Sequence, residues 1–208
     1  MNIRCGCVIA LIAYLLIHSP SALADDALKQ RLQTVSAYLL NEQNRENPNQ
    51  GKHETGFEEK RFSELLSEPA IFSGTLVYEP ATRSMSKIVS EPDEISMIMT
   101  EKAVIIESSE GKRRLSLRAR PALRAILVGF RALVEGDIEA LRSHFELDYK
   151  DNDSVWTLVL TPRSQRLARR LTSLVVSGQD TQVDSMVTTM QNGDRQEMTL
   201  LPVSAINE

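Results

Sequence analysis

Cysteine is nearly absent from this sequence, because Cys5 and Cys7 are its only two and both lie in the first 24 residues. That stretch has one basic residue near its start, Arg4, and continues into the apolar run Val8–Ile17, which is shorter than the roughly 20 residues of a membrane-spanning helix. It ends in Ala22-Leu23-Ala24 and is typical of a secretory signal peptide, so we expect residues 1–24 to be removed. A mature chain without cysteine excludes disulfide bonds and thiolate chemistry.

Histidines, glycine clusters and catalytic motifs are also scarce. Only His53 and His144 follow the signal peptide, and neither accompanies a G-x-S-x-G or S-x-x-K motif, so both are interpreted as surface residues, in a loop and at a strand start. Scattered single glycines exclude a phosphate-binding loop. Asp148, Asp151 and Asp153 resemble the front of a calcium loop but lack its later Gly and Glu, and are interpreted as part of a turn. We expect no metal, no cofactor and no enzyme activity, with a facing carboxylate pair of the glycosidase type left open.

Basic residues are fewer than acidic ones. Without residues 1–24 the chain keeps 23 Lys and Arg against 28 Asp and Glu, which gives a net charge of −5. Nucleic acid and anionic membrane surfaces are therefore poor partners. The run Arg163, Arg166, Arg169 and Arg170 is interpreted as a solvated face. With 42% hydrophobic composition, residues 25–208 are predicted to form a single domain.

Hydrophobic periodicity divides this domain into helices and strands. Apolar residues recur at helical spacing from Leu28 to Leu39, after an expected cap at Asp25 or Asp26, and residues 41–55 predict an exposed loop. A second helix is predicted over 121–136 and a shorter one after Asp137. Alternating or apolar runs between turn residues predict strands at 72–79, 85–89, 94–100, 103–107, 113–117, 144–150, 155–161, 171–177, 182–190 and 195–201.

The order of these elements predicts the fold class. Helix, meander, helix and meander is not a βαβ alternation, so a parallel nucleotide-binding sheet is disfavoured. Asn192-Gly193 predicts a final hairpin, and the last strand is expected at a sheet edge. The prediction is an α+β fold: an incomplete antiparallel β-barrel, formed by one strongly curved sheet, with helices covering its concave face.

Methionine has a flexible side chain that adapts to irregular apolar spaces. Met97 with Met99, and Met186 with Met190, share strand faces, and methionine suits a pocket for flexible hydrocarbon as well as it fills gaps in an ordinary core. Both interpretations stay open. The residues predicted to line an acyl-binding cavity are Leu76, Tyr78, Met97, Met99, Phe130, Trp156, Leu158, Met186 and Met190.

Several local strings resemble the periplasmic LolA-like carriers of outer-membrane lipoproteins, over nearly the whole mature chain. They are the opening helix from Asp26 to Leu39, Phe57–Arg61, Ser73–Pro80, Glu91–Glu94, Gly136-Asp137, Trp156–Pro162 and Gly193-Asp194. The resemblance implies a half-open antiparallel barrel with a helical lid over an apolar cavity. It also implies a monomeric periplasmic carrier of a Gram-negative cell, which takes acylated cargo from an inner-membrane exporter to an outer-membrane acceptor without chemistry.

Two departures from that family accompany the resemblance. The general carrier has an Arg before the Pro that ends its early strand, where it holds the lid closed, whereas Glu79 precedes Pro80 in this sequence and Arg83 is the nearest arginine. The polar 41–55 segment is also long for the family. Divergent members resemble proteins found beside exporters of other lipids, so the cargo is a lipoprotein or a glycolipid or polyene-type lipid. The alternatives are a lipid-sensing or scaffold domain docking to an inner-membrane partner, and a hydrolase.

Overall fold

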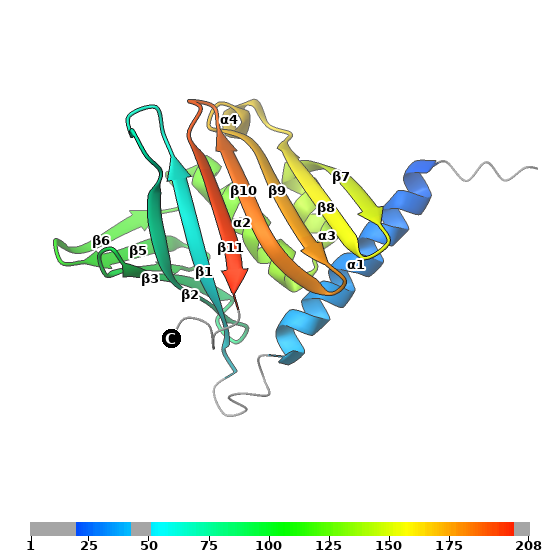
Figure 1. Cartoon of the computed structure of the whole chain (residues 1–208), viewed down its shortest axis with the longest axis horizontal. Helices are drawn as coiled ribbons and strands as arrows, with labels where there is room; N and C mark the ends of the chain where they lie inside the picture. The colour runs from blue at the N-terminus through cyan, green and yellow to red at the C-terminus, as the bar shows by residue number, and fades with distance from the viewer. Residues whose placement is uncertain (1–19, 43–50, 202–208) are drawn as a thin grey trace, which may run out of the picture.

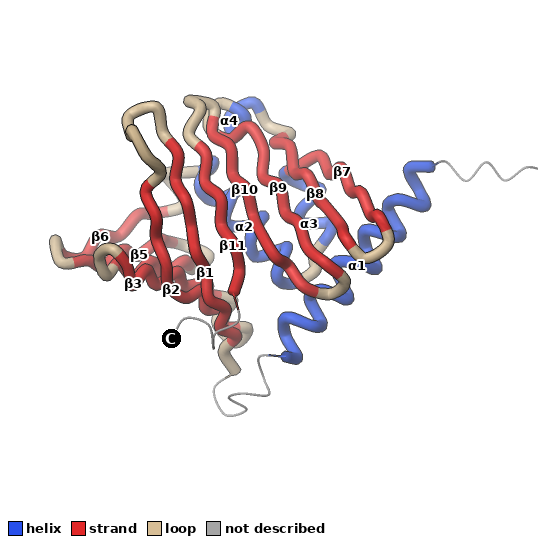
Figure 2. Tube along the Cα trace, in the orientation of Figure 1, coloured by secondary structure: helices blue, strands red, loops and turns tan. Residues whose placement is uncertain are grey.

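The computed structural model describes residues 20–42 and 51–201, in which eleven strands form one antiparallel sheet in the order β6-β5-β4-β3-β2-β1-β11-β10-β9-β8-β7 (Figure 1). The sheet is curved and unclosed, and the helices lie on its inner side (Figure 2). The predicted α+β fold class is therefore confirmed. The elements are α1 (Pro20–Glu42), β1 (His53–Phe62), β2 (Ala70–Glu79), β3 (Ser84–Glu91), β4 (Ile95–Met99), β5 (Ala103–Ser108), β6 (Gly111–Ser116), α2 (Pro121–Glu135), α3 (Ile138–His144), β7 (Phe145–Asn152), β8 (Val155–Pro162), α4 (Gln165–Ala168), β9 (Leu171–Gln179), β10 (Gln182–Met190) and β11 (Arg195–Leu201).

The sheet consists of two meanders that meet at one seam. β1 to β6 follow one another on one side, β7 to β11 on the other, and β1 pairs with β11 from Gly56↔Leu201 to Phe62↔Arg195. The prediction that the last strand lies at an edge is therefore wrong. Pairing between the first and last strands is a long-range contact that local sequence does not signal; the edges are β6 and β7.

The central helices begin and end where their local sequence predicts. Pro121 opens α2, where its missing N–H is no loss, and Gly136 ends the helix in the left-handed conformation with φ of +66°. The Asp137 carboxylate then accepts a hydrogen bond from the Ala140 backbone N–H at 3.0 Å and caps α3.

The first helix and the segment after it differ from expectation. α1 begins at Pro20 rather than at a cap on Asp25 or Asp26, because the helix continues through the predicted cleavage position. Residues 1–19 of the predicted signal peptide lie outside the described residues. The loop predicted over 41–55 is too long, since α1 extends to Glu42, β1 starts at His53, and residues 43–50 lie outside the described part.

The core lies between the inner face of the sheet and the helices. Leu28, Leu32 and Val35 of α1 are each 2% exposed and pack into one cluster with α2, α3 and strands β7 to β10. Trp156 of β8 lies over Gly178 of β9, where an added Cβ would lie 2.5 Å from the indole ring. The glycine is therefore what allows the large ring to lie flat on the sheet.

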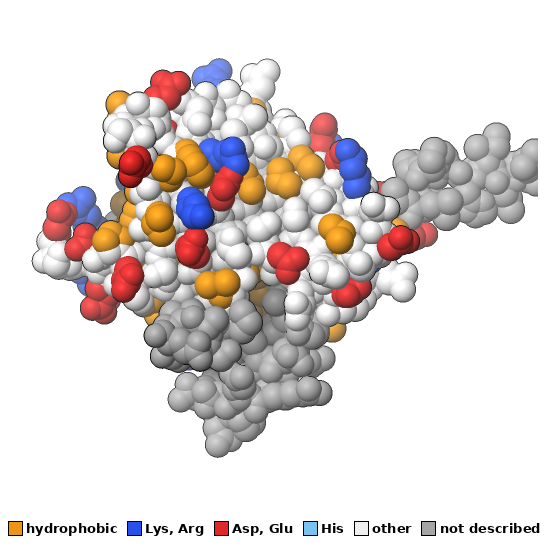
Figure 3. Space-filling model, in the orientation of Figure 1, with side chains coloured by type: hydrophobic (Ala, Val, Ile, Leu, Met, Phe, Trp, Pro, Cys, Tyr) orange, Lys and Arg blue, Asp and Glu red, His pale blue; other side chains and the backbone are white. Residues whose placement is uncertain are grey.

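The outer face of the sheet differs in character. In Figure 3 apolar and charged side chains are interspersed on the face turned towards the viewer. Ile71 and Val155 are among its exposed apolar residues, at 57% and 54%. Among the described helices, none has the length and apolar character needed to cross a membrane.

Candidate functional site

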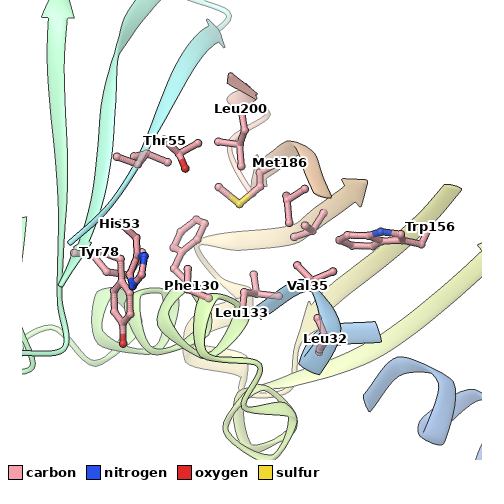
Figure 4. A pocket seen from close by; sticks show the side chains of 15 residues that line it. Leu32, Val35, His53, Thr55, Tyr78, Phe130, Leu133, Trp156, Met186 and Leu200 are labelled. Carbon is pink, nitrogen blue, oxygen red and sulfur yellow. The ribbon is translucent and has the colours of Figure 1, made fainter. Parts of the chain in front are cut away.

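An apolar cavity lies between the inner face of the sheet and helices α1 and α2 (Figure 4). Its volume is about 110 Å³. Strands from both meanders contribute to its wall, so the cavity crosses the β1–β11 seam. It is lined by Leu32, Val35, His53, Thr55, Leu76, Tyr78, Met85, Phe130, Leu133, Val134, Trp156, Val176, Val183, Met186 and Leu200.

Strand register explains why these side chains share one space. His53 pairs with Tyr78, and Tyr78 pairs with Met85, so all three lie side by side on one face. The same face continues across β10, where Met186 pairs with Val176 of β9. On the opposite wall, Phe130 and Leu133 are three residues apart in α2, which places both on the helical face turned to the sheet (Figure 4).

Five of the nine predicted lining residues reach the cavity wall: Leu76, Tyr78, Phe130, Trp156 and Met186. Of the remaining four, Leu158 is fully buried in the core and Met190 packs against that core. Met99 pairs with Met85 of the wall, and Met97 lies on the same face, but both belong to β4, one strand further from the cavity. The structure therefore places four candidates beside the cavity rather than in it.

His53 was missed as a cavity residue. It is 6% exposed on β1 rather than in a surface loop, and its ring stacks on Tyr78 with centroids 6.4 Å apart. The Nδ1 atom is buried and has no hydrogen-bond partner among the described residues. Burial lowers the pKa of His53 from its ordinary 6.5, because the charged imidazolium is poorly solvated there. His144, predicted at a strand start, is the last residue of α3.

Replacing His53 with leucine should reduce the loss of stability in mild acid. Because the pKa of His53 is lowered on folding, the unfolded chain binds a proton first as pH falls below 6.5, and the folded state loses stability until its own lower pKa is passed. Wild type should lose about 1 kcal/mol or less from this group between roughly pH 7.5 and 5.5. Urea unfolding at both pH values measures the difference. An unchanged acid dependence in His53→Leu would contradict the prediction.

One end of the cavity is closed by a polar cluster that ties α2 to the β2–β3 hairpin. The Tyr78 hydroxyl donates to Glu135 Oε1 at 2.6 Å, and Arg83 donates to the same carboxylate at 3.0 and 2.5 Å. Glu79, which precedes Pro80, instead accepts a hydrogen bond from Thr82 within the hairpin turn at 2.7 Å. The side chains of Tyr78, Arg83 and Glu135 are called the α2 latch below.

Burial, hydrogen bonds and neighbouring charges determine the protonation states of Glu135 and Tyr78 in the α2 latch. Burial alone would raise the pKa of Glu135, but hydrogen bonds from Arg83 and Tyr78, together with the charges of Arg83 and Arg131, outweigh it and hold that pKa below the ordinary 4.5. Burial and the bond to Glu135 raise the pKa of Tyr78 to about 12. At neutral pH the latch is therefore a carboxylate that accepts from a neutral phenol and a guanidinium.

A buried ion pair lies further along β1, on the same strand face as His53 and Thr55. Glu59 is 2% exposed and pairs with Lys87 of β3 and, at 2.5 Å, with Arg61. The Lys87 ammonium also lies 4.5 Å from the centre of the Phe57 ring. Removing Glu59 would leave the Lys87 ammonium buried without its carboxylate, whereas removing Lys87 would leave Glu59 paired with Arg61.

Helix α1 is attached to the sheet at a separate place. Arg31 donates to the Asp180 backbone carbonyl and to Asp151 Oδ2, each at 2.6 Å, and to the Tyr149 hydroxyl at 3.1 Å. Nearer the start of the helix, Asp25 pairs with Arg142 of α3 at 2.5 Å. The two walls that α1 and α2 provide are thus held by different side-chain clusters.

The other residues singled out from the sequence lie in ion pairs or at the surface in the described part of the chain. Asp151 is engaged by Arg31 and Tyr149, and the residues described contain no cluster of three or more His, Cys, Asp or Glu that could hold a metal. Arg166, Arg169 and Arg170 are exposed around α4, as a solvated face requires.

Comparison with known proteins gives a family and a set of distant structures. A family model described as outer membrane lipoprotein carrier protein LolA-like matches residues 37–207. None of the curated protein sequences matches the chain. Among solved structures, the chain is similar to a LolA superfamily protein from Nitrosomonas europaea, at 8% identity and a TM-score of 0.42 over 83% of this chain and 90% of that one. It is also similar to the lipoprotein LppX from Mycobacterium tuberculosis, at 9% identity and a TM-score of 0.39 over 85% and 94% of the two chains.

Proposed function

The chain belongs to the LolA-like family of outer membrane lipoprotein carrier proteins, and we propose that it carries acyl chains across the periplasm in the cavity beneath α1 and α2. The cargo is the acyl part of a lipoprotein or of another lipid, received from an inner-membrane exporter and delivered towards the outer membrane. The single observation that carries the proposal is a cavity whose wall is apolar over nearly all its residues and lies partly on helices rather than only on the sheet.

The free energy gained by burying hydrocarbon away from water favours binding of acyl chains in an apolar cavity. Burying ten methylene groups away from water is worth about 8 kcal/mol. A volume of about 110 Å³ is below the roughly 300–1,000 Å³ of small-molecule sites. The described conformation is therefore a contracted state, and cargo enters when α1 or α2 moves away from the sheet.

Cargo release depends on the relative stability of the contracted and expanded states. A ligand shifts a protein towards the conformation that it binds better, so an acyl chain favours the expanded state and an acceptor that removes the chain favours the contracted one. The α2 latch, which stabilises the contracted state, lowers the net affinity for cargo and so makes transfer reversible. No bond is made or broken in this cycle.

The proposal is tested by purifying the chain, exported with its own signal peptide, from periplasm without detergent. Native mass spectrometry should show a mature protein that begins at Asp25 and carries acyl-containing molecules, which lipid extraction would then identify. A fluorescent acyl donor in vesicles should also transfer to the protein. Only apoprotein, with no transfer, would contradict the carrier; copurification of an inner-membrane protein without lipid would favour the scaffold alternative.

A further inference from the structure

A second hollow lies against the other half of α2, and its lining is basic rather than apolar. Its volume is about 550 Å³, which is within the roughly 300–1,000 Å³ typical of ligand sites. The N-terminal half of α2, the end of β6 and the β4–β5 turn form its walls. The basic groove, as it is called below, is lined by Thr100, Glu101, Lys102, Arg114, Ser116, Leu117, Arg118, Arg124, Leu127, Val128 and Arg131.

The charges in the basic groove are strongly unbalanced. Glu101 is its single acid, and it already pairs with Arg131 at 3.7 Å and with Arg83 at 3.9 Å. Within the described residues, the other four cations of the groove, Lys102, Arg114, Arg118 and Arg124, pair with no carboxylate, and the first turn of α2 contains no acidic residue that would offset the helix dipole.

Sequence composition shows the same concentration of charge. Residues 111–134 contain seven Lys and Arg and no Asp or Glu, although the whole chain has a net charge of −4, so the rest of the chain carries −11. Like charges that converge on one hollow repel each other, and an anion bound among them removes that repulsion. Guanidinium groups match the oxygens of phosphate with paired hydrogen bonds.

The basic groove and the apolar cavity are neighbours along a single helix. α2 turns Arg124, Leu127, Val128 and Arg131 to the groove, and Phe130, Leu133 and Val134 to the cavity. Val128 and Phe130 are only about 3 Å apart along the helix axis, but they point about 200° apart around it, so a ligand that occupies both spaces must pass around α2. The buried Leu117 gives the groove an apolar floor as well. This arrangement suits an amphipathic molecule with an anionic end.

We propose that the basic groove binds the phosphate of a lipid headgroup whose acyl chains occupy the neighbouring cavity. The proposal rests on the carrier function and names its cargo class: a phosphate-bearing acyl lipid. Arg114, Arg118 and Arg124 hold the phosphate, while Arg131 stays paired with Glu101.

The test compares two lipids with the same short acyl chains, dihexanoylglycerol and dihexanoyl phosphatidylglycerol, on the full mature protein. Trp156 is the only tryptophan and lines the cavity, so its fluorescence reports acyl entry. The phosphate lipid should bind at least about tenfold more tightly, since charged hydrogen bonds each contribute to affinity. The variant Arg114→Gln with Arg118→Gln and Arg124→Gln should remove that difference and leave dihexanoylglycerol binding unchanged.

A matched control removes the same number of positive charges at a different place on the protein. Arg166→Gln with Arg169→Gln and Arg170→Gln removes three exposed arginines around α4, and this variant should bind both lipids as wild type does. The preference for the phosphate lipid should also weaken with added salt in wild type.

Five outcomes would overturn the assignment. Equal binding of the two lipids by wild type, or an unchanged preference in the groove variant, removes the phosphate site and leaves the carrier function intact. Inorganic phosphate that binds as tightly as the lipid indicates a site for the free ion. Binding to phosphatidylglycerol vesicles without binding of the short-chain lipid indicates membrane docking. A protein that binds neither lipid nor vesicles contradicts the carrier function itself.

Discussion

Met186→Asp should lose acyl binding by more than about 100-fold, because a carboxylate in the cavity wall must be desolvated each time hydrocarbon enters. Met186 lines the cavity from β10 and pairs with Val176, whose side chain is also in the wall. An ionised carboxylate without a partner costs several kcal/mol when water is removed from it. Transfer of a fluorescent fatty acid from vesicles, followed through Trp156, measures the loss.

Ser185→Asp is the matched control, since it introduces the same side chain at the adjacent residue. Ser185 pairs with Ser177 and Thr199 and points to the opposite face of the sheet from Met186. It should bind acyl chains as wild type does. A second cavity variant, Val183→Phe, narrows the same space without adding charge and should also weaken binding. If both cavity variants fold and retain wild-type affinity, the acyl chain does not occupy this cavity.

Glu135→Ala should open the lid, because it removes the acceptor shared by Tyr78 and Arg83. Three hydrogen bonds to the carboxylate are lost, one from Tyr78 and two from Arg83, and the Tyr78 hydroxyl is left without its acceptor, which should destabilise the contracted state by about 2 kcal/mol. That change corresponds to an increase of about 30-fold in the expanded population. Because acyl chains bind the expanded state, the variant should hold them more tightly. Slower net release to acceptor vesicles and greater binding of a hydrophobic dye by the empty protein would show it.

Acid should have the same effect on wild type. Because the pKa of Glu135 lies below 4.5, the latch is complete above pH 4.5 and is lost as pH falls through the lowered value. Glu135→Ala should therefore release cargo at a rate less sensitive to pH below 4.5. The control is Glu139→Ala, which removes an 81% exposed carboxylate of α3 paired with Arg142 at 3.8 Å and should leave release unchanged. Equal release rates for the Glu135 variant and wild type would exclude the latch.

Arg83→Asn separates the two donors of the latch. Arg83 has a φ of +50°, a conformation that asparagine tolerates better than most residues, so the turn should survive the exchange. The guanidinium is lost and the Tyr78 bond to Glu135 remains. We expect an effect on release that is smaller than that of Glu135→Ala and in the same direction.

Local signals predicted the helices and most strands well. Pro121 and Gly136 determine the ends of α2 through properties of single residues, and Asn192-Gly193 closes the β10–β11 hairpin as expected. β1 was missed because its buried positions include the polar residues His53 and Glu59, so the usual alternation of apolar and polar residues is hidden. Their burial depends on partners in other strands, which local sequence does not reveal.

The site was only partly predictable for a related reason. Strand alternation identifies which side chains face inward, and Tyr78, Met97 and Met99 all do so. Whether an inward side chain meets another side chain or an open space depends on where α2 crosses the sheet, and that is set by packing. The same limit applies to α1. Helical spacing predicts that Leu32 and Val35 are buried, but it does not predict that they line a cavity.

The seam between β1 and β11 also bears on how the chain folds. Every other strand pair joins neighbours along the chain or its meander, whereas Gly56 meets Leu201 from nearly the opposite end of the sequence. Contacts between distant residues require closure of a long loop and therefore form slowly. We expect the two meanders to form early and the β1–β11 pairing to form last, so the folding chain exposes the apolar inner faces of both meanders before the cavity is complete.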